Sequence, residues 1–362
     1  MDIEGRIRKL RRRMEDERAP AVLVSAPANL RYLTGFDGVI DDGINGACLV
    51  TADVTRFYTD MRYADAAAAA AEGGPWEVGI QRESLYVEVC DELHAMDVDS
   101  LAVESSVPYG RFKFISEQFR GAVRVIDHLI EDFRQIKEDE EVGRIAAAAA
   151  IADEAFHHML EYIAPGRTES EIALELEFTM RRNGSEGMPF SPIVASGPNG
   201  AHPHAIPGPR EVQPGDMIVL DFGARVGGYC SDMTRTVCVG KPTDEQRRIY
   251  DAVLAANEAG IAAVRAGMPC VDVDKAGRDV LAQRGFGDYF THGIGHGVGL
   301  DIHELPTIGP RSTQSLRDGA VVTIEPGVYV EGVAGVRIED LMVVDDGGHR
   351  RLTNAPKELI DI

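Results

Sequence analysis

The chain is poor in lysine, cysteine and aromatic residues, and each shortage limits what it can be. It has 6 lysines against 31 arginines, while Asp and Glu total 59, so the formal net charge is −22. Nucleic acid is a poor partner for such a surface, because phosphate binding needs a basic face. Two explanations of the acidity stay open. One is a high-salt cytoplasm that screens the repulsion between carboxylates, and the other is a GC-rich genome that favours Arg and Ala over Lys.

The five cysteines are scattered, odd in number and without any Cys-x-x-Cys pair. This pattern excludes a disulfide framework and a thiolate zinc site, and favours buried thiols in a reducing compartment. No apolar run is long enough to cross a bilayer. Residues 1–13 are rich in arginine and lack the apolar core of a signal peptide. We therefore expect a cytoplasmic protein with no membrane contact.

The 362 residues are enough for one or two sizeable cores. Residues 1–132 predict a small α/β domain, because short apolar runs typical of buried strands alternate with an alanine-rich stretch typical of a helix. The expected strands are 21–24, 46–50, 56–59 and 101–104, and the expected helix includes 66–71.

Residues 133–362 differ in their sequence pattern and predict a second domain. In this domain the order helix, helix, hairpin occurs twice. An Ala-rich helix begins at the acidic run 137–141, and a second helix begins at Thr168, with Glu171 completing a capping box. A hairpin at 217–239 follows. The same order then recurs with a helix capped by Thr243 and Gln246, a helix over 271–284 and a hairpin at 321–344.

Each predicted hairpin carries two acids around a glycine turn. Asp221 and Asp232 flank the first turn, and Glu325 and Glu339 flank the second. The first acids of the two pairs are 104 residues apart and the second acids 107 apart, which indicates two similar halves related by a pseudo-twofold axis. Folding should make the acids of each pair cross-strand neighbours and bring the pairs together. Clustered buried carboxylates need compensating cations, so the pattern favours a metal site over four separate surface acids.

A histidine- and glycine-rich segment, 292–304, supplies nitrogen ligands for such a site. It contains His292, His296 and His303, and its glycines allow close approach of the backbone. The segment is neither a dinucleotide-binding fingerprint nor a His-Glu-x-x-His motif. Composition alone does not say which histidine is the ligand.

These motifs, in this order, resemble the pita-bread metallopeptidases, and most of all the branch of prolidase (X-Pro dipeptidase) and aminopeptidase P. The matching segments are Asp221-Phe222-Gly223, His292-Gly-x-Gly-His296, Glu325-Pro326-Gly327 and Val336-Arg337-Ile338-Glu339-Asp340. Residues 29–36 and 59–63 resemble the N-terminal domain of that branch. The resemblance implies an α+β fold, with a creatinase-N-like α/β domain before a pita-bread catalytic domain.

The resemblance also implies the ligands of two divalent ions, most suitably Mn²⁺ and alternatively Co²⁺ or Fe²⁺. The implied ligands are Asp221, Asp232, His296, Glu325 and Glu339. Asp221 would chelate one ion, Asp232 and Glu339 would bridge both, and His296 and Glu325 would complete the coordination of the other ion. Family members act through a hydroxide that bridges the two metals and attacks the scissile carbonyl.

Further positions match the catalytic and substrate-binding residues of the family. The implied catalytic residues are His204, His303 and Glu325, with His202 the weaker alternative to His204. The implied substrate-binding residues are His204, His292, Tyr329 and Arg337. We expect proline-containing dipeptides or short peptides as substrates, and a homodimer in which Phe36, Asp37 and Ile40 are candidates for a loop that reaches the other subunit.

Three alternatives stay open. The N-terminal domain is short, which slightly favours a dipeptidase, but the sequence does not separate a dipeptidase from an aminopeptidase. The same scaffold serves hydrolases and lyases of small osmolyte-like substrates. It also serves binding modules without catalysis, although these typically lose metal ligands that this chain retains.

Overall fold

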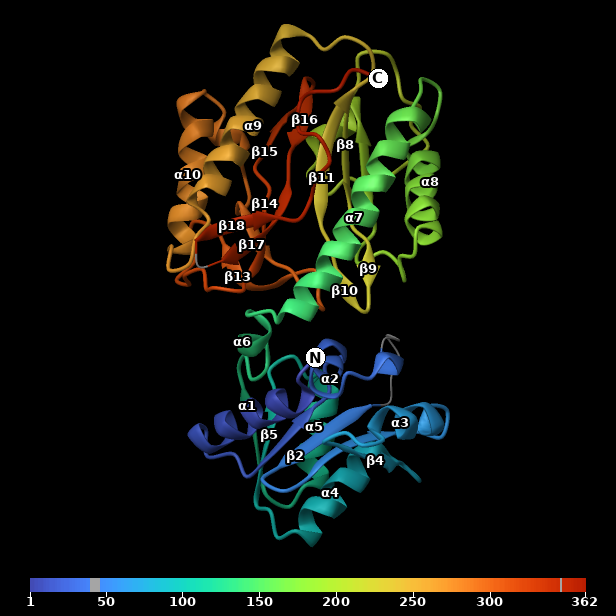
Figure 1. Ribbon diagram of the computed structural model, residues 1–362, viewed down its shortest axis with the longest axis vertical. Coiled ribbons are helices and arrows are strands. Elements are labelled where there is room, and N and C mark those ends of the chain that lie inside the picture. Colours follow the sequence, from blue (N-terminus) through green and yellow to red (C-terminus); the bar gives the residue numbers. More distant parts are fainter. Residues whose placement is uncertain (40–45, 346) are drawn as a thin grey trace. The chain divides into compact units, whose positions relative to one another are not determined.

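Figure 1 shows the computed structural model of the chain, which describes residues 1–39, 46–345 and 347–362. The chain forms two compact units, Met1–Arg134 and Gln135–Ile362. Among the described residues, no helix is both long enough and apolar enough to cross a membrane. All five cysteines are buried and free, in agreement with the absence of a disulfide framework.

The first unit is built on a six-stranded sheet with the order β4-β3-β2-β1-β5-β6. The strands are β1 (Ala21–Val24), β2 (Ala47–Thr51), β3 (Thr55–Thr59), β4 (Glu77–Ile80), β5 (Ser100–Glu104) and β6 (Ala122–Ile126). The central strand β1 is antiparallel to β2 and parallel to β5, and all four of its residues are buried. The four expected strands are therefore confirmed, since apolar runs covered on both faces form interior strands.

Helices pack around this sheet, and several of them were not foreseen. The helices are α1 (Ile3–Asp16), α2 (Pro27–Thr34), α3 (Ala64–Ala71), α4 (Leu85–Ala95), α5 (Tyr109–Gln118) and α6 (Glu131–Arg134), with a short 3₁₀ turn η1 (Asp37–Val39). The alanine-rich helix is confirmed as α3. The pattern did not reveal α2, α4, α5, β4 or β6, because their amphipathic stretches are short.

In the second unit, four helices occur as two pairs. The helices are α7 (Asp139–Tyr162), α8 (Glu169–Arg182), α9 (Asp244–Ala263) and α10 (Cys270–Gln283). The predicted capping boxes are present at Thr168 with Glu171 and at Thr243 with Gln246. These caps fix where α8 and α9 begin, because each satisfies backbone N–H groups of the first turn.

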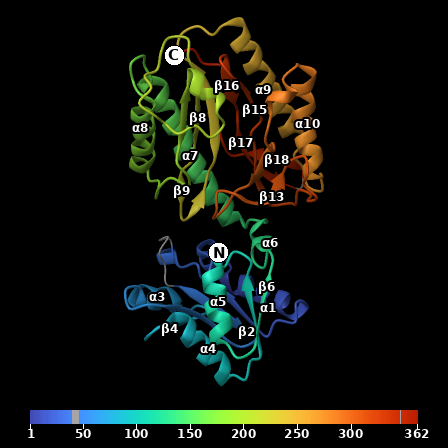
Figure 2. The ribbon, with the colours of Figure 1, turned by 180° about the vertical axis from the view of Figure 1, so that it is seen from behind.

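The strands of the second unit lie between the two helix pairs (Figures 1 and 2). One sheet has the order β11-β8-β7 and a second has the order β13-β12-β14-β17-β18, with two-stranded ribbons β9/β10 and β15/β16. The buried apolar side chains of α7 and α8 pack on the first sheet, and those of α9 and α10 pack on the second. The predicted repeat of helix, helix and hairpin is confirmed.

The strands of the first sheet are β7 (Ile193–Ser196), β8 (Met217–Phe222) and β11 (Met233–Cys238), and the ribbon is β9 (Arg225–Val226) with β10 (Tyr229–Cys230). Those of the second sheet are β12 (Gly295–Gly297), β13 (Glu304–Ile308), β14 (Val321–Ile324), β17 (Asp340–Asp345) and β18 (Gly348–Arg351), and the ribbon is β15 (Gly327–Val330) with β16 (Ala334–Arg337). Two short 3₁₀ turns complete the unit, η2 (Gly197–Ala201) and η3 (Gly287–Tyr289).

Each predicted hairpin is interrupted, which the sequence did not indicate. In both, the sheet strands stop at the acids, and a separate two-stranded ribbon closes the turn through glycines with positive φ, at Gly227, Gly228 and Gly332. The acids therefore lie where each hairpin passes from sheet to ribbon. Regular pairing is broken at this point, so the carboxylates are free to turn toward a common centre.

Candidate metal centre

The first acid pair shares one face of the sheet, but its members are not directly opposite. Asp221 pairs with Thr234 across β8 and β11, and Asp232 lies two residues before Thr234. Side chains two residues apart on a strand point to the same face. Asp221 and Asp232 are therefore diagonal neighbours across the two strands, in agreement with the expectation that they are cross-strand neighbours.

The members of the second acid pair, Glu325 and Glu339, lie directly opposite each other. Ile324 pairs with Asp340 across β14 and β17, and continuing this register by one residue places Glu325 opposite Glu339. The backbone N–H of Glu325 donates to Ile294 O, at 2.7 Å, and that of Glu339 donates to Thr234 O, at 3.1 Å. These two bonds fix Glu325 to the residue before β12 and Glu339 to β11.

The two pairs meet at the centre of the unit. Thr234 Oγ1 donates to Glu339 Oε2 at 2.7 Å, so a residue of the first hairpin holds an acid of the second. Potential ligand atoms of Asp232, His296 and Glu339 all lie within 4.8 Å of one another. The structure thus brings the two acid pairs together around one histidine of the 292–304 segment.

His296 projects from β12 and presents one specific nitrogen. Its Nδ1 lies 3.0 Å from Gly297 O, and because a carbonyl only accepts, the proton belongs on Nδ1. Nε2 is then an acceptor, and it lies 3.3 Å from Glu325 Oε1 and 3.6 Å from Asp232 Oδ2. A neutral imidazole oriented in this way by a backbone carbonyl is the usual arrangement of a metal-ligating histidine.

Glycines on either side of His296 allow its close approach. A Cβ on Gly295 would lie 2.0 Å from Thr323 O, and one on Gly297 would lie 2.2 Å from Leu305 O. No residue with a side chain fits at either position without moving a backbone. Thr323 also receives the N–H of His296 on its Oγ1, at 3.1 Å.

The electrostatics of the cluster favour a bound cation. Burial, and then the charge of Glu339, raises the pKa of Asp232 well above its usual value, and burial followed by the charge of Glu325 does the same for Glu339. Burial raises the pKa of Glu325 to about 8, although Arg337 opposes that shift. Burial lowers the pKa of His296 to about 4. A bound divalent ion would oppose the raised pKa values of the carboxylates and reinforce the lowered pKa of the imidazole, because it favours anionic carboxylates and a neutral imidazole.

Three carboxylate oxygens in this cluster make no hydrogen bond. They are Oδ1 of Asp221, Oδ1 of Asp232 and Oε1 of Glu339, and all three are buried. Buried polar atoms normally have partners, so these oxygens point to a ligand that fills the space among them. The donor set of carboxylates with one imidazole fits hard divalent ions.

Arg337 is the cation that the chain itself places beside the acids. Its guanidinium is buried, with Nη2 2.5 Å from Asp221 Oδ2. Nη1 donates to the Tyr329 hydroxyl at 2.7 Å and to Pro203 O at 3.2 Å, and Nε donates to Thr234 Oγ1 at 3.1 Å. With all three nitrogens engaged, Arg337 compensates charge and orients its neighbours.

Tyr329 links Arg337 to His292. The hydroxyl lies 3.1 Å from His292 Nε2, while His292 Nδ1 lies 2.8 Å from Gly293 O. The proton of His292 therefore belongs on Nδ1, and Tyr329 donates to Nε2. Burial lowers the pKa of His292 to about 4, which keeps this imidazole neutral.

The centre opens into a cavity of about 510 Å³. His204, His292, His303 and Arg337 line it, together with the five expected ligands, whereas Tyr329 and His202 are not lining residues. The rings of His303 and His296 are in edge contact, with centroids 4.4 Å apart. Apolar side chains form another part of the wall, among them Phe190, Ile193, Ile206 and Ile302.

Two buried carboxylates hold the segments that carry the cavity histidines. Glu169 of α8 accepts from Ser196 N at 2.7 Å and from Gly208 N at 3.2 Å, which fixes both ends of the His204 loop. Asp274 of α10 accepts from Ile294 N at 3.0 Å and from Arg278, whose Nη2 donates to His292 O at 2.7 Å. Each half of the unit thus uses its second helix to position part of the wall.

Sequence reasoning missed the threonines that support the acids. Thr234 lies two residues after Asp232, and Thr323 lies two residues before Glu325, with Thr323 Oγ1 3.2 Å from Glu325 Oε1. Strand alternation places each threonine on the same face as its acid. That spacing was a usable signal. The apolar wall had no such signal, because its residues come from separate loops.

The chain is similar to known metallopeptidases, in agreement with a metal centre at this site. Residues 143–346 match the Metallopeptidase family M24, and residues 6–136 match the Creatinase/Prolidase N-terminal domain. A Xaa-Pro dipeptidase of Pyrococcus horikoshii is 34% identical over 371 residues, which cover 99% of this chain and 100% of that protein.

Solved structures extend the similarity to the whole fold. A Xaa-Pro dipeptidase from Bacillus anthracis has a TM-score of 0.95 at 36% identity, with 100% of both chains covered. An X-Pro aminopeptidase from Thermotoga maritima has a TM-score of 0.87 at 33% identity, with 97% of this chain and 100% of that chain covered. The chain therefore belongs to metallopeptidase family M24, with a creatinase/prolidase-type N-terminal α/β domain followed by a pita-bread catalytic domain.

Proposed function

We propose that this metallopeptidase hydrolyses Xaa-Pro peptide bonds with two divalent ions held by Asp221, Asp232, His296, Glu325 and Glu339. The observation that carries the proposal is the group of buried carboxylate oxygens without hydrogen-bond partners around the Nε2 acceptor of His296. Mn²⁺ suits this oxygen-rich donor set best, with Co²⁺ or Fe²⁺ as alternatives. Ions bound there would supply Lewis acidity toward the scissile carbonyl and would acidify water in the site.

Glu325 is the proposed proton carrier. Its Oε1 is held by Thr323 Oγ1 at 3.2 Å, and the residue lines the cavity. The carboxylate would take a proton from the attacking water and deliver it to the proline nitrogen as that nitrogen leaves.

The histidines of the cavity wall are the proposed substrate contacts. His303, in contact with His296, would donate to the oxyanion that develops on the scissile carbonyl. His204 would bind the carbonyl or carboxylate end of the peptide, and His292 would complete that subsite. Arg337 and Tyr329 support the subsite through the chain of hydrogen bonds that ends on His292.

The proposed preference for proline rests on the similarity to Xaa-Pro peptidases and on the apolar side chains of the cavity wall. Proline has no N–H for backbone pairing, so a peptidase must recognise its ring and its fixed φ by shape. Phe190, Ile193, Ile206 and Ile302 offer an apolar surface for this ring and for the preceding side chain. The similarity extends to both a dipeptidase and an aminopeptidase, and we propose the dipeptidase on account of the short N-terminal domain.

The test is a substrate panel with protein loaded with Mn²⁺. We expect turnover of Xaa-Pro dipeptides, much slower turnover of matched Xaa-Ala dipeptides, and less turnover of Xaa-Pro-Yaa tripeptides. Faster cleavage of the tripeptides would assign an aminopeptidase. No turnover of any Xaa-Pro peptide would contradict the proposal and favour a hydrolase or lyase of a small osmolyte-like substrate on the same scaffold.

We also propose that the protein acts as a cytoplasmic homodimer. Of the three residues suggested for an intersubunit loop, Phe36 is buried and Asp37 forms an ion pair with Arg31 at 3.1 Å, while Ile40 lies outside the described residues. Sedimentation as a monomer at working concentration would contradict the dimer.

A further inference from the structure

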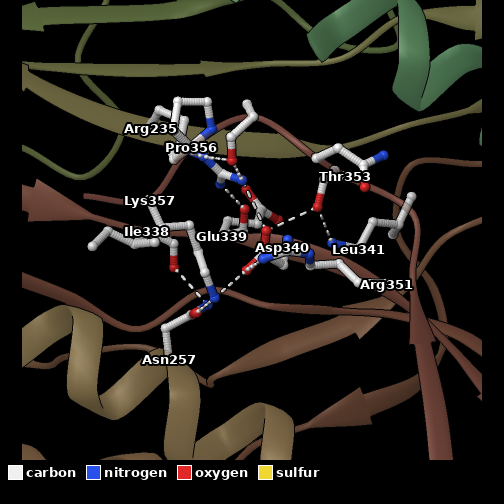
Figure 3. A network of polar contacts seen from close by, with 12 residues as sticks. Arg235, Asn257, Ile338, Glu339, Asp340, Leu341, Arg351, Thr353, Pro356 and Lys357 are labelled. Carbon is white, nitrogen blue, oxygen red and sulfur yellow. Dashed lines mark hydrogen bonds and ion pairs between the residues drawn. The ribbon is translucent and has the colours of Figure 1, made fainter. Parts of the chain in front are cut away.

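A buried polar network lies directly behind Glu339 (Figure 3). The side chains of Arg235 and Asp340 are 1% and 0% exposed, and Arg235 Nη2 lies 2.8 Å from Asp340 Oδ1. Lys357 Nζ lies 2.9 Å from Asp340 Oδ2, and Thr353 Oγ1 donates to Asp340 Oδ1 at 2.9 Å. We call residues 352–357 the C-terminal strap. The strap thus supplies Thr353 and Lys357 to a network around Asp340, the residue that follows Glu339.

Asn257 of α9 connects this network to both glutamate strands. Its Nδ2 donates to Ile324 O at 2.9 Å and to Ile338 O at 3.3 Å. These two carbonyls belong to the residues immediately before Glu325 and Glu339. One completely buried amide therefore links the backbones that carry the two glutamate ligands.

Lys357 sets the orientation of that amide. Its Nζ lies 2.8 Å from Asn257 Oδ1, and an ammonium group only donates. The amide oxygen must therefore face Lys357, which directs both N–H bonds of Nδ2 to the two backbone carbonyls. The tie between the glutamate strands thus depends on a residue of the C-terminal strap.

Arg235 holds the same backbone from the neighbouring strand. Its Nη1 donates to Thr234 O at 2.9 Å and also to Glu339 O. Arg235 and Lys357 both pair with Asp340, so the network joins the strand of Glu339 to the C-terminal strap.

We propose that Asn257, oriented by Lys357, is a positioning residue for the metal centre, which sets the separation of Glu325 and Glu339 and thereby the affinity for the divalent ions. The inference rests on the metal site proposed above. Partners beyond the ligands typically change metal affinity 10- to 100-fold when they are mutated, because they fix where the ligand atoms lie.

The other half of the unit provides a matched control. Asp153 of α7 also holds the C-terminal strap, accepting from Asn354 N at 2.8 Å and from Ala355 N at 2.8 Å. Its hydrogen bonds in the described structure go to Asn354 and Ala355, and no ligand-bearing strand is among its partners. Loss of Asp153 should therefore free the backbone of Asn354 and Ala355, while Lys357 keeps its contacts with Asn257 and Asp340 and the distance between the glutamates stays unchanged.

The experiment measures Mn²⁺ affinity by equilibrium dialysis and the visible absorption of the Co²⁺-loaded protein, with thermal unfolding of the metal-free protein as the stability readout. Asn257→Asp keeps the shape and the contact with Lys357 but replaces the two N–H donors by an acceptor. We expect it to weaken Mn²⁺ binding about 10- to 100-fold and to change the Co²⁺ spectrum. Lys357→Met, at a partly exposed position, should weaken binding by a smaller factor and serves if Asn257→Asp does not fold.

Asp153→Asn should lower the unfolding temperature and leave Mn²⁺ affinity and the Co²⁺ spectrum as in the wild type. The inference is overturned if the Asn257 and Lys357 variants bind Mn²⁺ as tightly as the wild type, or if Asp153→Asn weakens binding as much as they do. Failure of the metal site itself would look different, because the wild-type protein would then bind no Mn²⁺.

Discussion

The two halves of the catalytic domain share one architecture but contribute different chemistry. Ser196 pairs with Ile218 in the first half, and Gly297 pairs with Val322 at the corresponding place in the second. Continuing both registers by one residue makes His296 the counterpart of Ala195, and Thr323 the counterpart of Val219. The first half thus has a buried apolar pair where the second has an imidazole and the hydroxyl that fixes its backbone.

The acids show the same departure from symmetry. Asp221 and Glu325 hold equivalent places, but Glu339 lies opposite Glu325, whereas Asp232 is displaced by two residues from the position opposite Asp221. A shift of two residues keeps the face of the strand, and glutamate is one methylene longer than aspartate. The repeated fold supplies the scaffold, and substitutions at equivalent positions create a site with a single imidazole.

The largest loss of metal binding and activity is expected when an acid is replaced, because each half contributes acids to the site. Asp232→Asn should abolish both metal loading and hydrolysis, and Glu339→Gln should do the same, because each can replace a buried carboxylate oxygen that has no hydrogen-bond partner among the described residues. Metal content by atomic emission and turnover of an Xaa-Pro dipeptide are the measurements. Full activity in Asp232→Asn would refute the dinuclear assignment.

The next effect tests the difference between the halves. His296→Ala gives the second half the residue that the first half has at Ala195, and it removes one ligand from one ion. We expect metal affinity to fall by more than the roughly 10- to 100-fold that is typical when a partner of a ligand is mutated, with a parallel loss of activity at limiting Mn²⁺. His202→Ala, an exposed residue that does not line the cavity, should leave both unchanged. If His296→Ala bound metal as tightly as the wild type, the difference between His296 and Ala195 would have no role in metal binding.

A third effect concerns pH and the metal-free protein. Because burial raises the pKa of Glu325 to about 8, this group stabilises the fold at pH values below its unfolded pKa, and that contribution is lost as pH rises through about 8. The lowered pKa of His296 acts in the opposite direction, but only as pH falls below its unfolded value. Metal-free protein should therefore lose stability between about pH 7 and 8, by up to roughly 1.4 kcal/mol per pH unit for each proton involved.

Thermal melts in a chelator over this range measure that slope. Glu325→Gln should reduce it, since a neutral amide does not titrate, and Mn²⁺ should suppress it in the wild type. An unchanged slope in Glu325→Gln would mean that another group controls the titration.

A smaller effect distinguishes the two cavity histidines that come from different halves. His303→Ala should lower kcat more than it changes KM, because the proposed contact forms as the oxyanion develops. His204→Ala should mainly raise KM, by removing a contact to the bound peptide. Steady-state kinetics with one dipeptide give the split, and the reverse pattern would exchange the two roles.

The smallest effect concerns the surface rather than the site. If the acidic, lysine-poor surface is an adaptation to high salt, molar KCl should raise the melting temperature by screening repulsion among the carboxylates. A melting curve that does not shift upward would leave genome composition as the explanation.

Much of the fold could be predicted from short patterns in the sequence. The capping boxes at Thr168 and Thr243 fixed the helix starts, because each uses residues only three positions apart. The acid pairs and the repeat were also visible, since they depend on spacing along the chain. The interrupted hairpins and the displaced Asp232 were not visible, because a strand shifted by two residues has the same alternation.

The sequence by itself determined the repeat of helix pairs and hairpins in the catalytic domain, the family and the set of groups available to bind metal ions. Only the tertiary structure decided that Asn257 joins the strands of Glu325 and Glu339, that Tyr329 lies behind the cavity wall, and that Arg337 is engaged with Asp221. The physical reason is distance along the chain. Local hydrogen bonding and side-chain alternation are encoded over a few residues, whereas the bonds of Asn257 to Ile324 O and of Arg337 to Asp221 join segments 67 and 116 residues apart, which meet only in the folded domain.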